Sequence, residues 1–348
     1  MYCIGLDIHK KHTQACVKDE NGKVIVNERF LSEAVAINAF LDRLHGAEAK
    51  VVMEATGFYQ YIYEMIEARG FEVTLAHPLK LKALTAGRAK TDHNDAEMLA
   101  ELLSINAIPA SYVPPKEIRE LRDLTRHRSS LIAESTTLKN KIHAELARRG
   151  TKPPAEARSA FSKKFIGWLR GLKMSMIDDL LDILEMVQDK IKKIDVRIKD
   201  EANKDEDIHL LETIPGVGHV VAMTIKAEVG DVGHLDSSDA PASYAGLAPA
   251  VRRSGESKGH TGGMSKHGNP RLRYMLTEAV HVHVMFCEDS RLAAFFLRKK
   301  EEKGSKKATV ATAKKLLEIM YLMIARRQAF QAHWLDRFVL LASGNAPC

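Results

Sequence analysis

The order of short apolar runs in the first eighty residues constrains the fold more than any other feature of the sequence. Three runs with strand character come first, and they are followed by helical and strand-like patterns in alternation. The sequence predicts strands at 2–7, 12–18, 24–30, a run ending at Glu54, and 72–76, with helices at 32–44 (Ser32 as a candidate N-cap) and 58–69. A three-strand meander followed by this alternation predicts a mixed α/β sheet, not an all-parallel one.

Two of these strands end in a carboxylate. Asp7 closes the first strand and Glu54 the fourth, while Asp92 and Asp95 lie three residues apart at the start of a helical pattern. Each has an ordinary structural interpretation as a strand end, an N-cap or a helix-dipole partner. An unpaired buried charge is costly, however, and oxygen ligands that converge from separate elements suit hard cations. We therefore expect Asp7, Glu54, Asp92 and Asp95 to form a site for Mg²⁺, or Mn²⁺, of the kind that supports phosphoryl displacement.

The predicted order of elements matches the RNase H-like fold, which carries its first carboxylate on the first strand and its second on the fourth. This match is an analogy at the level of the fold. From 116 to about 204 the chain reads as helical, interrupted at Pro153 and Pro154. The second long helix carries an apolar coiled-coil seam, which fits an internal antiparallel helix pair and an oligomerisation arm equally well. The seam consists of Leu180, Leu184, Val187, Ile191, Ile194 and Ile198.

The C-terminal part contains a glycine turn and a long segment rich in glycine, serine and basic residues. The turn at 214–218 includes Gly216 and Gly218, where backbone amides can approach a phosphate closely; it resembles the hairpin of helix-hairpin-helix DNA-binding modules. The segment at 244–273 shows no predicted element, which is typical of functional loops. We predict three domains: an RNase H-like nuclease domain at 1–112, a helical coiled-coil region at 113–205, and a mainly α-helical domain at 206–348.

The overall charge favours a polyanionic partner. The chain of 348 residues has 52 Lys and Arg against 45 Asp and Glu, for a formal net charge of +7. Its four cysteines show neither metal-ligand spacing nor a disulfide framework, as expected of reduced thiols in a cytoplasmic protein. No apolar run reaches the length of a membrane span, so no membrane association is expected.

Six motifs, in this order along the chain, resemble those of the transposases of insertion sequence family 110. These enzymes are site-specific recombinases with an N-terminal RuvC-like DEDD nuclease domain and a C-terminal transposase domain. The motifs are Gly5-Leu6-Asp7-Ile8-His9, Met53-Glu54-Ala55-Thr56-Gly57, Lys90-Thr91-Asp92-His93-Asn94-Asp95-Ala96, Ile214-Pro215-Gly216-Val217-Gly218, Tyr244-Ala245-Gly246-Leu247-Ala248-Pro249 and Ser254-Gly255.

The resemblance implies specific roles and partners. It assigns the metal tetrad to the four carboxylates named above and the transposase nucleophile to Ser254, with Ser257 and Ser265 close enough to leave the register open. It also implies a structured guide RNA from the element itself, which pairs with donor and target DNA. Finally, it implies a dimer or tetramer in which the acidic domain of one subunit meets the serine domain of another, in the cytoplasm and associated with the nucleoid.

A serine hydroxyl is a poor nucleophile unless its proton is removed and cations stabilise the developing charge. Arg252 and Arg253 lie next to Ser254 and can supply that charge. Our hypothesis is that metal held by the tetrad helps to activate Ser254, which attacks a DNA phosphate and forms a covalent phosphoserine. The candidate nucleic-acid contacts are Gly216, Gly218, Arg252, Arg253, Lys266, Arg271 and Arg273.

Two alternative functions remain open at this level. A structure-specific RuvC-like endonuclease that hydrolyses DNA would need the tetrad but not Ser254. A non-catalytic scaffold for nucleic acid would need neither. Actin-like ATPases and sugar kinases are disfavoured, because their phosphate loop needs glycine soon after the first aspartate, whereas here Asp7 is followed by Ile8-His9-Lys10-Lys11.

Overall fold

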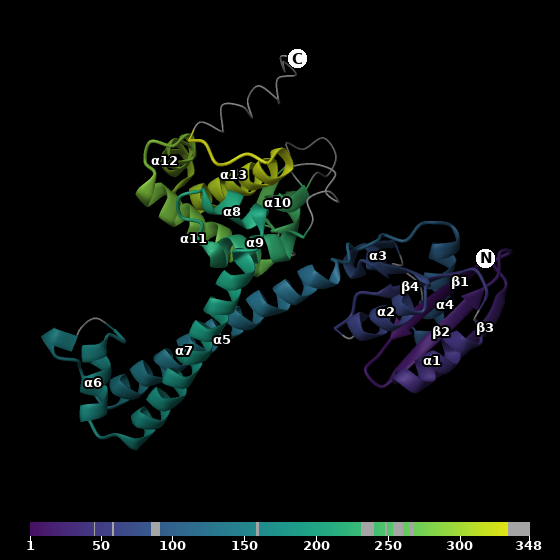
Figure 1. Ribbon diagram of the computed structural model, residues 1–348, viewed down its shortest axis with the longest axis horizontal. Helices are drawn as coiled ribbons and strands as arrows, with labels where there is room; N and C mark the ends of the chain where they lie inside the picture. Colours follow the sequence, from purple (N-terminus) through teal and green to yellow (C-terminus); the bar gives the residue numbers. More distant parts are fainter. Residues whose placement is uncertain are drawn as a thin grey trace, which may run out of the picture. The chain divides into compact units, whose positions relative to one another are not determined.

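The chain folds into two compact units, which are considered separately (Figure 1). The first unit spans Met1–Val113 and the second Pro114–Cys348. The computed structural model describes residues 1–44, 46–57, 59–84, 91–157, 160–230, 240–247, 249–252, 260–264 and 268–332.

The first unit is built on one five-stranded mixed sheet in the order β3-β2-β1-β4-β5. The central strand β1 pairs antiparallel with β2 and parallel with β4. The mixed sheet predicted from the sequence is thus confirmed, and the predicted strand ends agree to within one residue. The strands are β1 (Tyr2–Ile8), β2 (His12–Lys18), β3 (Val24–Leu31), β4 (Ala49–Glu54) and β5 (Glu72–Ala76).

Helices cover both faces of this sheet. On one face, α1 (Ala34–Asp42) and α2 (Tyr59–Ala68) pack their apolar sides against the even-numbered residues of β1. On the other face lies α4 (Asp92–Ser104). Such an arrangement follows from the alternation of side chains along a strand, because an apolar strand inside a sheet must bury both of its faces.

One helix was not predicted, and one local expectation was wrong. The helix is α3 (Pro78–Leu84), which begins at Pro78 because proline is well suited to the first turn of a helix. Ser32 is not the N-cap of α1, because that helix begins at Ala34 with Glu33 in the N-cap position. The Ser32 hydroxyl instead donates a hydrogen bond to the His9 carbonyl oxygen at 2.8 Å.

Gly5 sets how closely α4 approaches β1. A Cβ atom at Gly5 would lie 2.1 Å from the Ala96 carbonyl oxygen and 2.6 Å from the Ala100 nitrogen. Both are backbone atoms of α4, so no side chain can turn aside to make room. The glycine therefore allows the helix to lie directly on the strand, and the N-terminal turn of α4 is held near the carboxyl end of β1.

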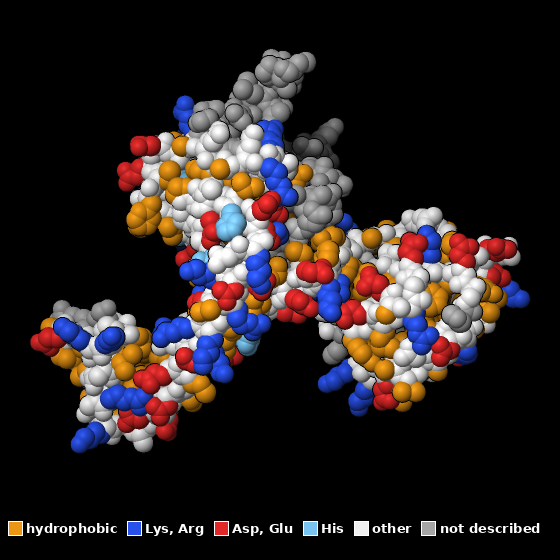
Figure 2. All heavy atoms as spheres, in the orientation of Figure 1, with side chains coloured by type: hydrophobic (Ala, Val, Ile, Leu, Met, Phe, Trp, Pro, Cys, Tyr) orange, Lys and Arg blue, Asp and Glu red, His pale blue; other side chains and the backbone are white. Residues whose placement is uncertain are grey.

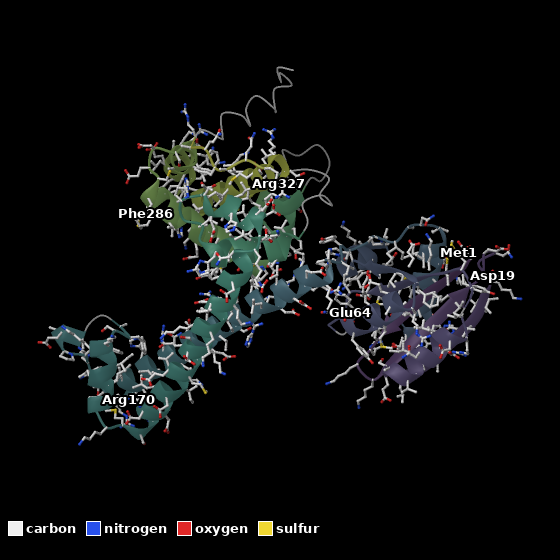
Figure 3. The ribbon with its side chains drawn as sticks, in the orientation of Figure 1. Met1, Asp19, Glu64, Arg170, Phe286 and Arg327 are labelled. Carbon is white, nitrogen blue, oxygen red and sulfur yellow. The ribbon has the colours of Figure 1, made fainter. Side chains whose placement is uncertain are left out.

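The second unit begins with a long antiparallel helix pair, α5 (Lys116–Arg148) and α7 (Ser175–Ala202), with the short α6 (Lys163–Gly171) at its far end (Figure 1). Arg170 of α6, labelled in Figure 3, donates to an oxygen of Asp182 on α7 at 2.6 Å. The predicted apolar seam of α7 is buried within this unit, except that Leu181 takes the buried position expected for Leu180. Leu184, Val187 and Ile191 cluster with residues of α5 and α6, whereas Ile194 and Ile198 belong to the core of the helical bundle described next.

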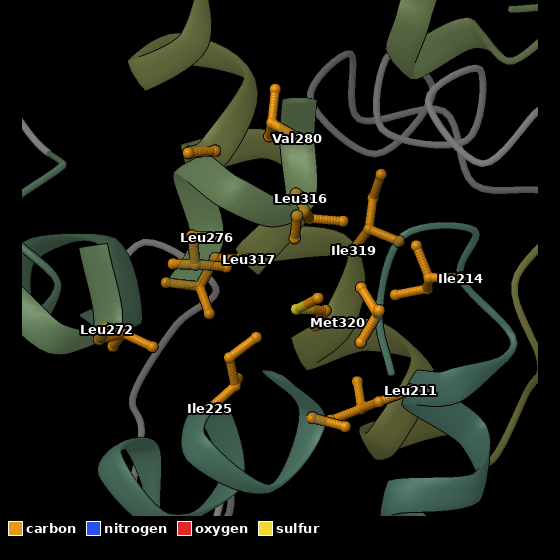
Figure 4. Packing of buried hydrophobic residues seen from close by; sticks show 14 of the residues in the cluster. Leu211, Ile214, Ile225, Leu272, Leu276, Val280, Leu316, Leu317, Ile319 and Met320 are labelled. Carbon is orange, nitrogen blue, oxygen red and sulfur yellow. The ribbon is translucent and has the colours of Figure 1, made fainter. Parts of the chain in front are cut away.

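The rest of the second unit is a helical bundle around one large apolar core. Figure 4 shows Leu211, Ile225, Leu276, Leu316 and Met320 among the buried residues of this core. The helices are α8 (Glu206–Glu212), α9 (His219–Val229), α10 (Ala240–Tyr244), α11 (Pro270–Phe286), α12 (Arg291–Lys303) and α13 (Ser305–Arg326). Among the helices that the structure describes, none is long and apolar enough to cross a membrane.

The expectation that 244–273 lacks secondary structure was also wrong. The segment contains two short strands, β6 (Pro249–Arg252) and β7 (His260–Met264), which pair antiparallel as a separate two-stranded sheet. The sequence did not predict them, because the many Gly, Ser and basic residues hide the short alternation that would mark a strand.

Candidate active site

The pleat of the sheet directs Asp7 and Glu54 to the same face. Cys3 of β1 and Val52 of β4 pack in one cluster with α4, and side chains at every second residue of a strand share a face. Asp7 lies four residues after Cys3, and Glu54 two residues after Val52. Leu6 of β1 pairs with Met53 of β4 in the parallel register. Asp7 and Glu54 are the residues that follow this pair, so they occupy equivalent positions near the ends of two adjacent strands.

The N-terminal turn of α4 supplies the other two carboxylates. Asp92 is the first residue of the helix, and Asp95 lies one turn further on. The N-cap is Thr91, whose hydroxyl accepts a hydrogen bond from the Asn94 nitrogen at 3.2 Å. The interpretation of Asp92 as an N-cap is therefore wrong. Because Thr91 does the capping, the carboxylate of Asp92 is left to interact with the sheet.

Two histidines connect these elements. His9 Nε2 lies 3.0 Å from Asp7 Oδ2 and 3.4 Å from Asp92 Oδ1. His12 Nε2 lies 3.3 Å from Asp92 Oδ2. Asp7 and Asp92, separated by more than eighty residues in the sequence, are thus both within hydrogen-bonding reach of a single nitrogen atom. The structure brings together the first and third of the predicted metal ligands.

The surroundings favour the ionised form of Asp92. The hydrogen bond with His12 lowers the pKa of Asp92, and the nearby charges of His9, His12 and Arg29 act in the same direction. Asp7 is only 9% exposed, so its carboxylate needs a positive partner, and His9 is in position to be one. A divalent cation would satisfy the same need.

The chemistry of the predicted donors suits a divalent metal, because carboxylate oxygens are ligands that Mg²⁺ and Mn²⁺ accept. Of the four predicted carboxylates, Asp7 and Asp92 are the two that the described contacts bring together, at His9. His9, His12 and Asp92 also offer one ligand atom each, all within 4.8 Å of one another. Sequence reasoning missed the two histidines. The positions of the two histidines in the sequence could have identified them, because His9 lies two residues after Asp7 and His12 is the first residue of the strand that pairs with β1.

A hollow lies beside this cluster on the surface of the first unit. Its volume is about 470 Å³, and His9 forms part of its wall. Lys10, Gly57 and Tyr61 line it further, so it combines a cation, an open backbone position and an aromatic ring. Groups of this kind contact the phosphates and bases of single-stranded nucleic acid.

The predicted nucleophile belongs to the second unit. Ser254, Arg253 and Lys266 lie outside the described residues, and Arg252 is the last residue of β6. Gly246 precedes these residues in the sequence and Gly268 follows them, and the backbones of the two glycines lie in close contact. A Cβ atom on Gly268 would lie 2.1 Å from the Gly246 Cα atom, so only glycine allows these two backbones to touch.

The buried carboxylate of Glu228 is hydrogen-bonded to Asn269, the residue that follows Gly268. Glu228 Oε1 accepts from Arg126 Nε at 2.8 Å, and Glu228 Oε2 accepts from Arg126 Nη2 at 2.7 Å and from Asn269 Nδ2 at 2.7 Å. Burial alone raises the pKa of Glu228, but the bonds and charge of Arg126, with smaller effects from Asn269 and Arg122, bring the pKa below its usual value. Asn269 in turn donates its backbone N–H to the Tyr244 carbonyl at 2.8 Å. Sequence reasoning missed this network, although a lone carboxylate in the apolar stretch before Val229 was a signal that a buried partner exists.

The glycine turn joins α8 and α9 as predicted, but its two candidate glycines differ. Gly216 has φ +94°, and a Cβ there would lie 2.8 Å from the His283 nitrogen, so this position packs against α11. Gly218 faces open space among the described residues and begins α9 without a side-chain cap. Of the predicted basic contacts, Arg271 is exposed, whereas Arg273 Nη1 donates to the Gly246 carbonyl at 3.5 Å.

Comparison with known proteins identifies the family of the chain. One family model, described as transposase and defined on DEDD transposases of the IS110 type, matches residues 4–149. A second, described as transposase of the IS116/IS110/IS902 family, matches residues 208–296. Together they cover more than half of the sequence. The chain belongs to the IS110 family of transposases.

Curated relatives of this IS110-family transposase match over almost its whole length. The transposase for insertion sequence element IS1111A of Coxiella burnetii is 27% identical over 338 residues, covering 94% of this chain and 91% of the relative. The transposase for element IS1328 of Yersinia enterocolitica is 25% identical, with coverages of 94% and 98%. The pilin gene-inverting protein of Moraxella bovis is 26% identical, with coverages of 94% and 97%.

Family membership confirms the resemblance drawn from the motifs. A DEDD transposase domain has an RNase H-like fold, and the mixed five-stranded sheet of the first unit agrees with it. The transposase is accordingly an enzyme that acts on DNA and belongs to a class that uses a divalent metal.

Proposed function

We propose that this transposase cuts and rejoins DNA strands through a covalent phosphoserine intermediate on Ser254. In the proposal, Asp7, Glu54, Asp92 and Asp95 hold Mg²⁺ or Mn²⁺. The observation that carries the metal site is the position of His9, whose Nε2 reaches carboxylates on both β1 and α4. Sequence-distant carboxylates are costly to bring together unless a cation is shared between them.

The residues divide the chemistry between the two units. The Ser254 hydroxyl oxygen forms a bond to a DNA phosphorus, the bond from that phosphorus to the leaving strand breaks, and the departing DNA oxygen takes up a proton. Arg252 and Arg253 stabilise the charge on the phosphoryl oxygens. When bound, a divalent ion lowers the pKa of a coordinated hydroxyl and neutralises phosphate charge. Attack by the hydroxyl of an incoming strand on the phosphoserine then reverses the step and frees Ser254.

A covalent intermediate suits recombination because it conserves the energy of the phosphodiester bond for rejoining. The Moraxella relatives carry the name pilin gene-inverting protein. Inversion of a gene requires that cut strands be rejoined, which favours strand transfer over hydrolysis in this chain as well.

The partners in the proposal are donor and target DNA, a structured guide RNA from the element, and further copies of the chain in a dimer or tetramer. The net charge of +7 supports polyanionic partners. Basic and acidic side chains are interspersed on the visible face of the α5–α7 pair, so the sign of the surface there is mixed (Figure 2). Among the local features, the exposed Arg271 and the open N-terminus of α9 at Gly218 are the best placed to contact phosphate.

A denaturing-gel assay for protein–DNA adducts tests the proposal. The protein is expressed with its native flanking DNA as wild type, Ser254→Ala and Asp7→Asn, with Ser257→Ala as the matched control. We expect an adduct in the wild type and in Ser257→Ala, and its loss in the other two. An adduct that persists in Ser254→Ala would refute the assignment of the nucleophile. Nicking without any adduct, abolished by Asp7→Asn, would identify a hydrolytic endonuclease instead.

A further inference from the structure

We propose that His9 and His12 are ligands of the metal, so that the site binds through nitrogen as well as oxygen and prefers Mn²⁺ to Mg²⁺. This inference rests on the proposed function, because it takes the DEDD carboxylates as the metal site. It adds two residues to that site and changes the ion for which the site is selective.

The spacing of the ligand atoms supports the assignment. Two ligands that bind one divalent transition ion at about 2.1 Å lie roughly 3 to 4.2 Å apart, depending on the angle between them. One atom each from His9, His12 and Asp92 lies within 4.8 Å of the other two. A small closure around an ion would bring all three to ligand distance. Asp92 contacts His9 Nε2 through Oδ1 and His12 Nε2 through Oδ2, so both nitrogen atoms lie next to the same carboxylate.

The backbone holds the two imidazoles next to each other. The His9 nitrogen donates to the His12 carbonyl oxygen at 2.9 Å, which closes the turn between β1 and β2. The His9 carbonyl accepts from the Ser32 hydroxyl, and that hydroxyl also lies 2.8 Å from Thr13 Oγ1. The ring centroids are 4.9 Å apart with a tilt of 32°. Ligands fixed by their own turn lose little conformational entropy on metal binding.

Ligand chemistry then sets the choice of ion. Mg²⁺ strongly prefers oxygen ligands and keeps several of its waters, whereas imidazole nitrogen favours first-row transition ions. A set of carboxylates with two imidazoles therefore favours Mn²⁺, which accepts both ligand types. The side chains of His9 and His12 are 45% and 24% exposed, so an ion can reach them from solvent.

An ion pair between His9 and the carboxylates would explain the same short distances without metal ligation. The two interpretations differ in one observable, which is direct contact between nitrogen and the bound ion. Only the ligand interpretation predicts that contact.

Pulsed electron paramagnetic resonance of bound Mn²⁺ measures it. Full-length protein is loaded with Mn²⁺ alone, and electron spin-echo modulation from ¹⁴N reports ligating imidazole. The variants are His9→Ala combined with His12→Ala, Asp7→Asn, and His93→Ala as the matched control. His93 is an exposed histidine next to Asp92 on α4. We expect ¹⁴N modulation in the wild type and in His93→Ala, and its loss in the double variant.

Affinity provides the second readout. Titration of the free Mn²⁺ signal should show binding weakened by about tenfold or more in the double variant, as for loss of groups that tune a metal site. Competition with Mg²⁺ should show a preference for Mn²⁺ that falls in the same variant. Mn²⁺ that binds the wild type in an Asp7-dependent manner without ¹⁴N modulation would overturn the inference and leave the proposed function intact. Wild type that binds no Mn²⁺ at all would overturn both.

Discussion

Replacement of Gly5 by alanine tests whether close packing of α4 on β1 assembles the site. The new Cβ would lie 2.1 Å from the Ala96 carbonyl oxygen and 2.9 Å from the Leu99 Cβ. Since real Cβ atoms stay at least 3.0 Å from such neighbours, the helix has to move by about 1 Å or the strand has to bend. Forcing one methyl group into a packed core typically costs about 1 to 3 kcal/mol, and backbone on both sides puts this case at the upper end, roughly 3 kcal/mol.

The displacement also acts on the site, because Asp92 and Asp95 move with α4 while Asp7 stays with β1. Displacement of a metal ligand by about 1 Å is enough to weaken binding by an order of magnitude or more. We therefore expect Gly5→Ala to lose stability in the first unit and to bind Mn²⁺ at least about tenfold more weakly.

Hydrogen exchange followed by mass spectrometry is the appropriate assay, since the chain has two units and a single unfolding free energy is not defined. Peptides from β1 and α4 should lose protection in Gly5→Ala, while peptides from α5 and α7 keep theirs. Gly57→Ala is the control in the same unit, because a Cβ there meets none of the described atoms within 4 Å. Protection of β1 and α4 that stays within about 0.5 kcal/mol of wild type would refute the packing argument.

Three further predictions follow from the described contacts. Glu228→Gln should destabilise the second unit by about 3 kcal/mol, measured as lost hydrogen-exchange protection in α9, because it breaks a buried pair with Arg126. The pKa of Glu228 is lowered from 4.5, so the ionised side chain stabilises the second unit fully above pH 4.5, and this stabilisation is lost as the pH falls through the lowered pKa. Over that acidic range the wild type should lose exchange protection in α9, whereas Glu228→Gln should not. Equal losses in the two proteins would contradict the assignment. Thr91→Ala should cost about 1 kcal/mol of protection in the first turn of α4, and an unchanged exchange rate would show that the cap is dispensable. Burial raises the pKa of the Cys16 thiol to about 11, so alkylation of native protein at pH 8 should modify the partly exposed Cys287 well before Cys16; comparable labelling rates would argue against a buried Cys16.

Local sequence patterns were enough to predict a mixed sheet and the strands that Asp7 and Glu54 close. Strand and helix periods are local properties, so the predicted strand ends agree with the structure to within one residue, while no start was predicted for β4. The same period of two places Asp7 on the face of Cys3, and Glu54 on the face of Val52, once the strands pair in parallel. Six motifs in one order along the chain were enough to identify the family, which the two family models confirm.

The partners of the buried carboxylates depend on the tertiary structure. His12 contacts Asp92 across 80 residues of sequence, and Arg126 contacts Glu228 across 102. No local pattern encodes such pairs, because they depend on the path of the chain and on how closely helices approach the sheet. Gly5 illustrates this dependence. A glycine in a buried strand indicates that another segment packs closely there, but only the fold shows that the segment is the backbone of α4, which brings Asp92 to His9.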